Sequence, residues 1–120
     1  MATLTPTLTL VSTDATSDAL SITVTDSLTV TTPTVGLSRA TITTADNQEI
    51  VDNDLNGQIY VYIKNLDGTN YVKLQNTASQ EWGQLKAGEF AFFPLIHGAG
   101  LEVRADTASC NIEYTYWTAG

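Results

Sequence analysis

Residues 59–64 read Ile-Tyr-Val-Tyr-Ile-Lys, and this stretch indicates the fold class most clearly. Its aliphatic residues occupy every second position, which is the period of a β-strand whose successive side chains face opposite sides. β-Branched and aromatic residues also favour strands over helices. Because Tyr60 and Tyr62 are largely apolar too, we expect both faces of this strand to be covered, either by two sheets or by a sheet and another subunit, and we favour the subunit contact.

The same alternation extends in both directions along the chain, whereas helical periodicity is almost absent. Short turn signals separate the alternating segments, and Asp67-Gly68 is expected to join strands 58–65 and 71–75 as a hairpin. Eight to ten short strands with regular turns predict an all-β fold, a β-sandwich of jelly-roll-like type.

The 120 residues suit a single domain, 1–120, but the chain has two regions of different composition. Residues 1–44 contain 20 Ser or Thr and no aromatic residue, while residues 45–120 contain all ten aromatics. The sequence therefore predicts a Thr/Ser-rich strand arm followed by an aromatic-rich β core. The arm segment either supplies outer strands of the same sandwich or pairs with a neighbouring subunit by strand addition. Pro6 fits an edge strand in either case.

The charge balance disfavours two classes of partner. The net charge is −8 with a pI of about 4.2, and the five basic residues are scattered singly. Nucleic acids and anionic membranes both require a concentrated basic surface, so neither is an expected partner. The longest apolar run, residues 90–96, is far too short to cross a bilayer, and the N-terminus carries no secretory signal pattern.

The residues that could support catalysis are few and isolated. His97 is the single histidine and Cys110 the single cysteine, so no intramolecular disulfide can form. We expect His97 in a surface turn and Cys110 as a small buried apolar residue. The available acids alternate with apolar residues, as on a solvated strand face. No catalytic residue and no cofactor are predicted, and the chain is expected not to be an enzyme.

One segment resembles the opening of a calcium loop. Residues 52–57 read Asp-Asn-Asp-Leu-Asn-Gly, which places the oxygen-bearing side chains of Asp52, Asp54 and Asn56 at alternate positions. Position twelve of the loop is Ile63 rather than the bidentate glutamate. A plain polar turn before the next strand is therefore the preferred interpretation, with calcium as a weak alternative.

Aromatic side chains supply the candidate interaction residues. Exposed Trp and Tyr anchor protein interfaces and also stack on sugar rings, so both kinds of partner are open. Phe93 and Trp117 are expected on the faces opposite two core rows, Phe90 with Phe92 and Ile112 with Tyr114. The predicted interface residues are Tyr60, Tyr62, Trp82, Phe93 and Trp117.

Several stretches resemble small β-rich virion proteins of tailed phages, particularly those that infect marine bacteria and cyanobacteria. The chain starts Met-Ala-Thr-Leu-Thr-Pro-Thr-Leu-Thr-Leu, and residues 61–74 read Val-Tyr-Ile-Lys-Asn-Leu-Asp-Gly-Thr-Asn-Tyr-Val-Lys-Leu. Residues 82–95 follow as Trp-Gly-Gln-Leu-Lys-Ala-Gly-Glu-Phe-Ala-Phe-Phe-Pro-Leu, and residues 110–117 as Cys-Asn-Ile-Glu-Tyr-Thr-Tyr-Trp. Together these stretches cover most of the chain, and none of them is a catalytic signature.

The resemblance implies a capsid decoration, or cement, protein that stabilises the shell through the major capsid protein. Such a protein is expected on the outer capsid surface of the virion, as a homotrimer, after synthesis in the bacterial host cytoplasm. The alternative is a tail, neck or head-fibre protein that binds a glycan of the host surface. In both cases the protein acts by binding its neighbours.

Overall fold

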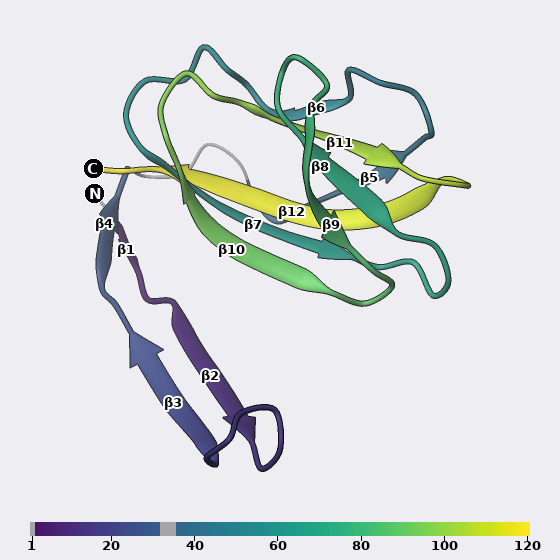
Figure 1. Cartoon of the computed structure of the whole chain (residues 1–120). Helices are drawn as coiled ribbons and strands as arrows, with labels where there is room; N and C mark the ends of the chain where they lie inside the picture. The colour runs from purple at the N-terminus through teal and green to yellow at the C-terminus, as the bar shows by residue number, and fades with distance from the viewer. Residues whose placement is uncertain (1, 32–35) are drawn as a thin grey trace. The chain divides into compact units, whose positions relative to one another are not determined.

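The computed structural model describes residues 2–31 and 36–120, and β-strands are the only regular elements in these ranges (Figure 1). The prediction of an all-β fold is therefore confirmed. The chain divides into two compact units, Met1–Thr32 with Gly120 and Pro33–Ala119. We call the described residues 2–31 the arm and residues 36–119 the sandwich.

The arm is one long antiparallel hairpin. Its first two strands are β1 (Ala2–Leu4) and β2 (Thr7–Ser12), and its last two are β3 (Leu20–Thr25) and β4 (Leu28–Val30). β1 pairs with β4 and β2 with β3, in a register that continues from one ladder to the next. The amide of Asp26 donates to the carbonyl of Pro6 at 3.1 Å between the two ladders. The arm strands therefore pair with each other within one chain.

The two faces of the arm differ sharply in chemistry. One face carries leucine, isoleucine and valine, and we call it the apolar stripe: Leu4, Leu8, Leu10, Leu20, Ile22, Val24 and Leu28. The other face is almost entirely Thr and Ser. On it, the hydroxyls of cross-strand pairs meet, Thr7 with Thr25 at 3.2 Å and Thr9 with Thr23 at 3.3 Å. The Thr-alternating sequence thus builds a ribbon with one polar and one apolar face.

The sandwich contains two four-stranded antiparallel sheets. The first has the order β10-β7-β12-β5 and the second β6-β11-β8-β9. Their strands are β5 (Ser38–Ile42), β6 (Glu49–Val51), β7 (Ile59–Asn65), β8 (Val72–Gln75), β9 (Glu81–Leu85), β10 (Phe90–Leu95), β11 (Leu101–Ala105) and β12 (Cys110–Thr118). Because β5 pairs with β12, the sandwich begins before residue 44, where the arm was expected to end.

The connections between these strands follow jelly-roll order. From β5 to β12 the chain changes sheet at every connection except the one from β8 to β9. The eight strands are thereby interleaved in two sheets as in a jelly roll. The expected jelly-roll-like sandwich is confirmed.

The hairpin predicted at Asp67-Gly68 is wrong, because β7 and β8 lie in different sheets. A buried asparagine and a turn aspartate account for the sheet change. The amide of Asp67 donates to Asn65 Oδ1 at 3.0 Å, and Asp67 Oδ2 accepts from the amides of Thr69 and Asn70. The two bonds that the carboxyl accepts, first from Asn70 and then from Thr69, lower the pKa of Asp67. They hold the segment as an arch between sheets, whereas the Asp-Gly pair alone resembles a two-residue hairpin turn.

The core lies between the two sheets and is aliphatic. Ile59, Val61 and Ile63 of β7 are buried, and they alternate with part-exposed Tyr60 and Tyr62. The remaining core members come mainly from β8, β11 and β12: Val72, Leu74, Leu101, Val103, Ala105, Cys110 and Ile112. The main core thus falls in the C-terminal part as expected. Its aromatic residues pack at its margin or lie outside it rather than at its centre.

Candidate functional site

Aromatic side chains gather on the outer face of the first sheet. Register places Phe92 opposite Tyr62, and Trp117 opposite Tyr60, on the side away from the core. Tyr60 and Phe92 stack with ring centroids 6.3 Å apart and planes inclined by 9°. With Phe90, which is 65% exposed, these residues form what we call the aromatic face: Tyr60, Tyr62, Phe90, Phe92 and Trp117. Three of the five predicted interface residues therefore lie together.

One end of the aromatic face is charged. Glu113 of β12 lies opposite Arg39 of β5 on one side and Lys64 of β7 on the other. Tyr62 donates its hydroxyl to Glu113 Oε2 at 2.9 Å. Burial, followed by this hydrogen bond, raises the pKa of Tyr62, so the phenol remains a hydrogen-bond donor at neutral pH. The aromatic face thus ends in a row of alternating charges that can orient a partner.

The remaining two predicted interface residues lie elsewhere. Phe93 faces the core opposite Val61, whereas Phe90 and Phe92 are exposed, so the predicted orientation of this strand is wrong. The strand carries apolar residues on both faces, and its sequence therefore contains no alternation that could identify the buried side. Trp82 lies at an irregularity in the pairing of β8 with β9, where the register shifts, and it contacts Phe93.

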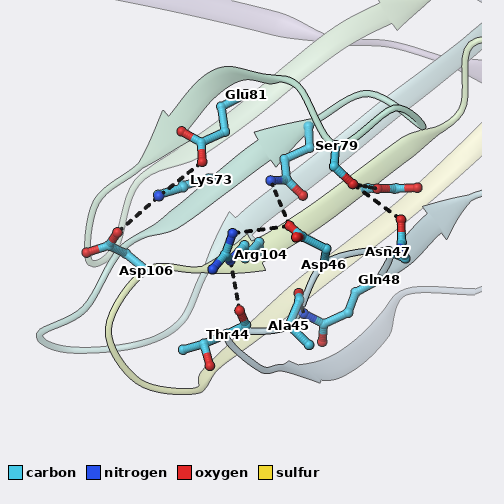
Figure 2. A network of polar contacts seen from close by, with 12 residues as sticks. Thr44, Ala45, Asp46, Asn47, Gln48, Lys73, Ser79, Glu81, Arg104 and Asp106 are labelled. Carbon is cyan, nitrogen blue, oxygen red and sulfur yellow. Dashed lines mark hydrogen bonds and ion pairs between the residues drawn. The ribbon is translucent and has the colours of Figure 1, made fainter.

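The outer face of the second sheet is polar and covered in part by the chain itself. Figure 2 shows the β5–β6 connection lying against β11, where Arg104 donates to the Thr44 carbonyl at 2.8 Å and pairs with Asp46 at 3.2 Å. Ser79 reaches Asn47 at 3.3 Å. No sequence signal pointed to this network, because its members are far apart in the chain. Its consequence is an asymmetric sandwich, with one outer face closed by polar contacts and the other aromatic.

An ion-paired row continues this second outer face. Lys73 lies 3.1 Å from Glu81 and 3.2 Å from Asp106, as Figure 2 shows. Hydrogen bonds from Thr107, Lys73 and Tyr71 lower the pKa of Asp106. Hydrogen bonds to Glu81 and then to Asp106 raise the pKa of Lys73. These side chains satisfy one another, so this face offers neither a free cation nor an apolar contact surface at these positions.

The weak calcium candidate lies in the turn after β6. Asp52 Oδ1 accepts a hydrogen bond from the amide of Asp54 at 2.8 Å, which is the contact of a plain Asx turn. Asp52, Asp54 and Asn56 are all exposed. Within residues 2–31 and 36–120, no group of three or more His, Cys, Asp or Glu side chains is placed to hold a metal ion. The geometry accordingly favours a plain polar turn over a calcium site at residues 52–57.

The two isolated nucleophile candidates have opposite environments. His97 is exposed in the turn after β10, whereas Cys110 is buried in β12. The thiol of Cys110 points towards the carbonyls of Ala108 at 3.5 Å and Tyr71 at 3.9 Å. Burial, and then the negative charge of Asp67, raise its pKa, so the sulfur stays a thiol at neutral pH. The placement expected for both residues is confirmed.

No helix among the described residues could cross a membrane. No protein-family model, curated protein or solved structure matches this chain. Function must therefore be inferred from the structure itself, that is, from the jelly roll with its aromatic face and from the arm with its apolar stripe.

Proposed function

We propose that this protein is a structural subunit of a phage virion, a capsid decoration protein that stabilises the shell by contacting the major capsid protein. The observation that carries the proposal is the aromatic face, a cluster of exposed and part-exposed aromatic side chains on the outer face of the first sheet. Apolar patches of this kind on a small protein mark interaction surfaces. Tyr and Trp are the usual anchors of such interfaces.

Three further features support the same role. Jelly rolls recur in viral capsid proteins, although the fold alone does not establish function. The net charge of −8 suits an outer surface that never meets packaged DNA. The resemblance of the sequence to phage virion proteins points the same way. We place the protein on the outer capsid surface, assembled after synthesis in the host cytoplasm, with homotrimers as the form that shell symmetry favours.

The test is rebinding of the purified protein to capsids from which it has been stripped. Trp117→Ala and Phe92→Ala should each weaken binding at least tenfold, since each removes a large apolar contact. The matched control is Tyr71→Phe, which changes an aromatic residue outside the aromatic face and should bind normally. Undiminished binding of both aromatic-face variants would remove this surface from the interface.

Copy number per virion provides the broader test. Hundreds of copies at a fixed ratio to the major capsid protein are expected from quantitative mass spectrometry, and capsids without the protein should rupture at lower temperature. About a dozen copies or fewer would instead place the protein in the neck or tail. That result would contradict a decoration role.

A second candidate function is adhesion to a glycan of the host surface. The stacked pair Tyr60 and Phe92, with Trp117 beside it in register, favours this alternative because aromatic rings on a sheet face can stack on sugars. A glycan array distinguishes the two functions. Specific glycan binding that is lost in Trp117→Ala would favour adhesion, whereas an array without signal leaves decoration as the function.

A further inference from the structure

The free edge of β10 is an open and apolar strand edge. β10 is the outermost strand of the first sheet, and among the described residues it pairs only with β7 (Figure 1). The exposed large apolar residues of the sandwich, apart from Leu37, all lie on β9, on β10 or in the turn after β10: Trp82, Phe90, Phe92 and Ile96. An open apolar edge is a template for pairing with another strand.

The backbone bonds at the start of β10 determine which of its amides face this edge. The amide of Asn65 donates to the Glu89 carbonyl at 2.9 Å, one row beyond the pairing of Phe90 with Lys64. Because bonded rows alternate along an antiparallel ladder, the residues of β10 that bond to β7 are Ala91, Phe93 and Leu95. The amides and carbonyls of Phe90 and Phe92 therefore point to the free edge.

The other side of β7 gives the same alternation. The amide of Leu66 donates to the Asn111 carbonyl at 2.9 Å, and the amide of Ala119 donates to the Gln58 carbonyl at 2.8 Å. These bonds direct the even-numbered residues of β7 towards β12, so its odd-numbered residues bond to β10. Pro94 then lies where its missing N–H would have faced the free edge, which is the position that a strand tolerates for proline.

One register lets this edge pair with a copy of itself. When two β10 strands run antiparallel with Ala91 on the twofold axis, Phe90 lies opposite Phe92 of the second copy, and the free amides and carbonyls of both residues find partners. In the next row Pro94 lies opposite Gly88, whose amide already donates to the Asn65 carbonyl at 3.1 Å. The residue without a donor thus meets a residue that needs no acceptor. If Phe92 lay on the axis instead, the Phe90 carbonyl would face Pro94 and would lack a donor.

The charge and size of the side chains also favour a second copy of this chain as the occupant. Residues 90–96 carry no charge, so two chains of net charge −8 can approach here without like charges between the strands. The carboxylate of Glu89 accepts from the amide of Lys86 at 2.7 Å and is thereby held in its own turn. The small side chain of Ala91 suits the axis, where the two strands come closest.

A hollow beside the edge is available to the second strand. It has a volume of about 420 Å³ and is lined by Gln84, Leu85, Gly88, Glu89 and Phe90. The register that opposes Pro94 to Gly88 brings Pro94 and Leu95 of the second copy alongside this hollow. The second strand therefore meets a depression at its end rather than a protruding side chain.

We propose that two copies of this chain pair through β10, antiparallel and with Ala91 on the twofold axis, so that their first sheets form one continuous sheet. Backbone bonds give such a contact its specificity, and its small area makes the pairing reversible. Copies held side by side on a particle pair more completely, because their effective concentration is high. The inference goes beyond the proposed function and does not depend on it. An isologous contact joins copies only in twos, so on a shell it links subunits of neighbouring trimers.

Cysteine cross-linking tests the register. Ala91→Cys places two thiols opposite each other on the axis, where the Cα atoms are about 4.5 Å apart and can be bridged by a disulfide. Oxidation with copper–phenanthroline should therefore give disulfide-linked dimers in high yield. Phe92→Cys is the matched control, because its two copies are diagonal neighbours at about 7–8 Å, at or beyond the limit for a disulfide. Wild-type protein gives the background, since its single Cys110 is buried.

Two results of this experiment would overturn the pairing. One is a dimer yield for Ala91→Cys no higher than the wild-type background. The other is faster cross-linking of Phe92→Cys than of Ala91→Cys, which is what exposure alone predicts, because Phe92 is exposed and Ala91 only half-buried.

A second comparison isolates the backbone bonds. In the Ala91→Cys protein, Phe90→Pro removes the ring and the free N–H, whereas Phe90→Thr removes the ring and keeps the N–H. Because this N–H enters the contact twice, Phe90→Pro should lower the dimer yield about tenfold relative to Phe90→Thr. Equal yields from two variants with wild-type circular dichroism would contradict strand pairing. Capsid rebinding of Trp117→Ala, on β12, tests the proposed function separately, so the two can fail independently.

Discussion

Trp82 of β9 and Phe93 of β10 contact each other edge to face, with ring centroids 5.6 Å apart and planes at 89°. The two strands belong to different sheets, so this pair joins the sheets at one side of the sandwich. Edge-to-face geometry is a favoured arrangement of aromatic rings. Trp82 is 52% exposed, so this contact covers only part of its side chain.

The two members of this pair should differ in their effect on stability. Phe93→Ala is expected to cost about 2–4 kcal/mol, because Phe93 packs against the core opposite Val61. Trp82→Ala should cost about 1 kcal/mol, since half of its surface already faces water. Urea denaturation of both variants measures the difference. A larger loss for Trp82→Ala than for Phe93→Ala would show that the pair is not organised around the core as described.

Asn65 should be sensitive to any change of its amide. Its Nδ2 donates to the carbonyls of Asn70 at 2.9 Å and Leu85 at 3.1 Å, and its side chain is fully buried. Asn65→Leu removes both of these bonds and the bond from the amide of Asp67, and we expect a loss of about 2–4 kcal/mol. Asn65→Asp keeps the acceptor but loses both donors, so it should also destabilise the protein at pH 7. Thermal melts of the two variants check this, and an unchanged midpoint for Asn65→Leu would refute the role assigned to the amide.

Gly100 and Gly88 provide a matched pair of glycine positions. Both have positive φ, +68° and +79°, so alanine at either position is expected to cost about 1–2 kcal/mol. A Cβ at Gly100 would also come within 3.0 Å of Asn53 and Thr77 and 3.1 Å of the Val51 carbonyl. Gly100→Ala should therefore lose about 1–3 kcal/mol more than Gly88→Ala, where nothing lies within 4 Å. Chemical denaturation of both variants tests this, and equal losses would mean that the space around Gly100 is not closed.

Glu49 should make stability depend on pH in a direction opposite to most carboxyls. Burial, followed by the charges of Asp52 and Glu102, raises its pKa above the ordinary 4.5. A raised pKa means that folding favours the protonated form. The stabilising contribution of Glu49 to the free energy of unfolding is therefore fully present below the ordinary pKa. It is lost as the pH rises through the pKa that Glu49 has in the folded protein.

Glu49→Gln should accordingly stabilise the protein at pH 7 by a few tenths of a kcal/mol, because it removes a like charge directly opposite Glu102. Near pH 3 the variant and the wild type should melt at the same temperature. Asp18→Asn in the loop between β2 and β3 changes the net charge equally and serves as control. If both variants raised the melting temperature alike, net charge rather than the Glu49–Glu102 pair would be responsible.

The aromatic face shows how far a site could be inferred from sequence here. Tyr60 and Tyr62 could be identified because they alternate with the aliphatic row of Ile59, Val61 and Ile63, which is a local pattern. Trp117 alternates with a row that contains Ile112 and two tyrosines. Phe93 was assigned to the wrong side, since the neighbouring Phe90 and Phe92 are equally apolar. Only pairing with β7, which aligns Phe93 with Val61, determines which face of β10 is buried.

Alternation along each segment was enough to determine that this chain forms strands and which way most of their side chains point. Side-chain direction in a strand depends on the nearest residues, so it can be read locally. The partner of each strand is a different kind of property, because pairing joins residues far apart in the chain. Only the tertiary structure showed that the bonds of Asn65 and Asp67 send β8 into the other sheet, and that β2 pairs with β3 of its own chain. Long-range pairing is set by the packing of the whole core and by buried hydrogen bonds, which no single segment contains.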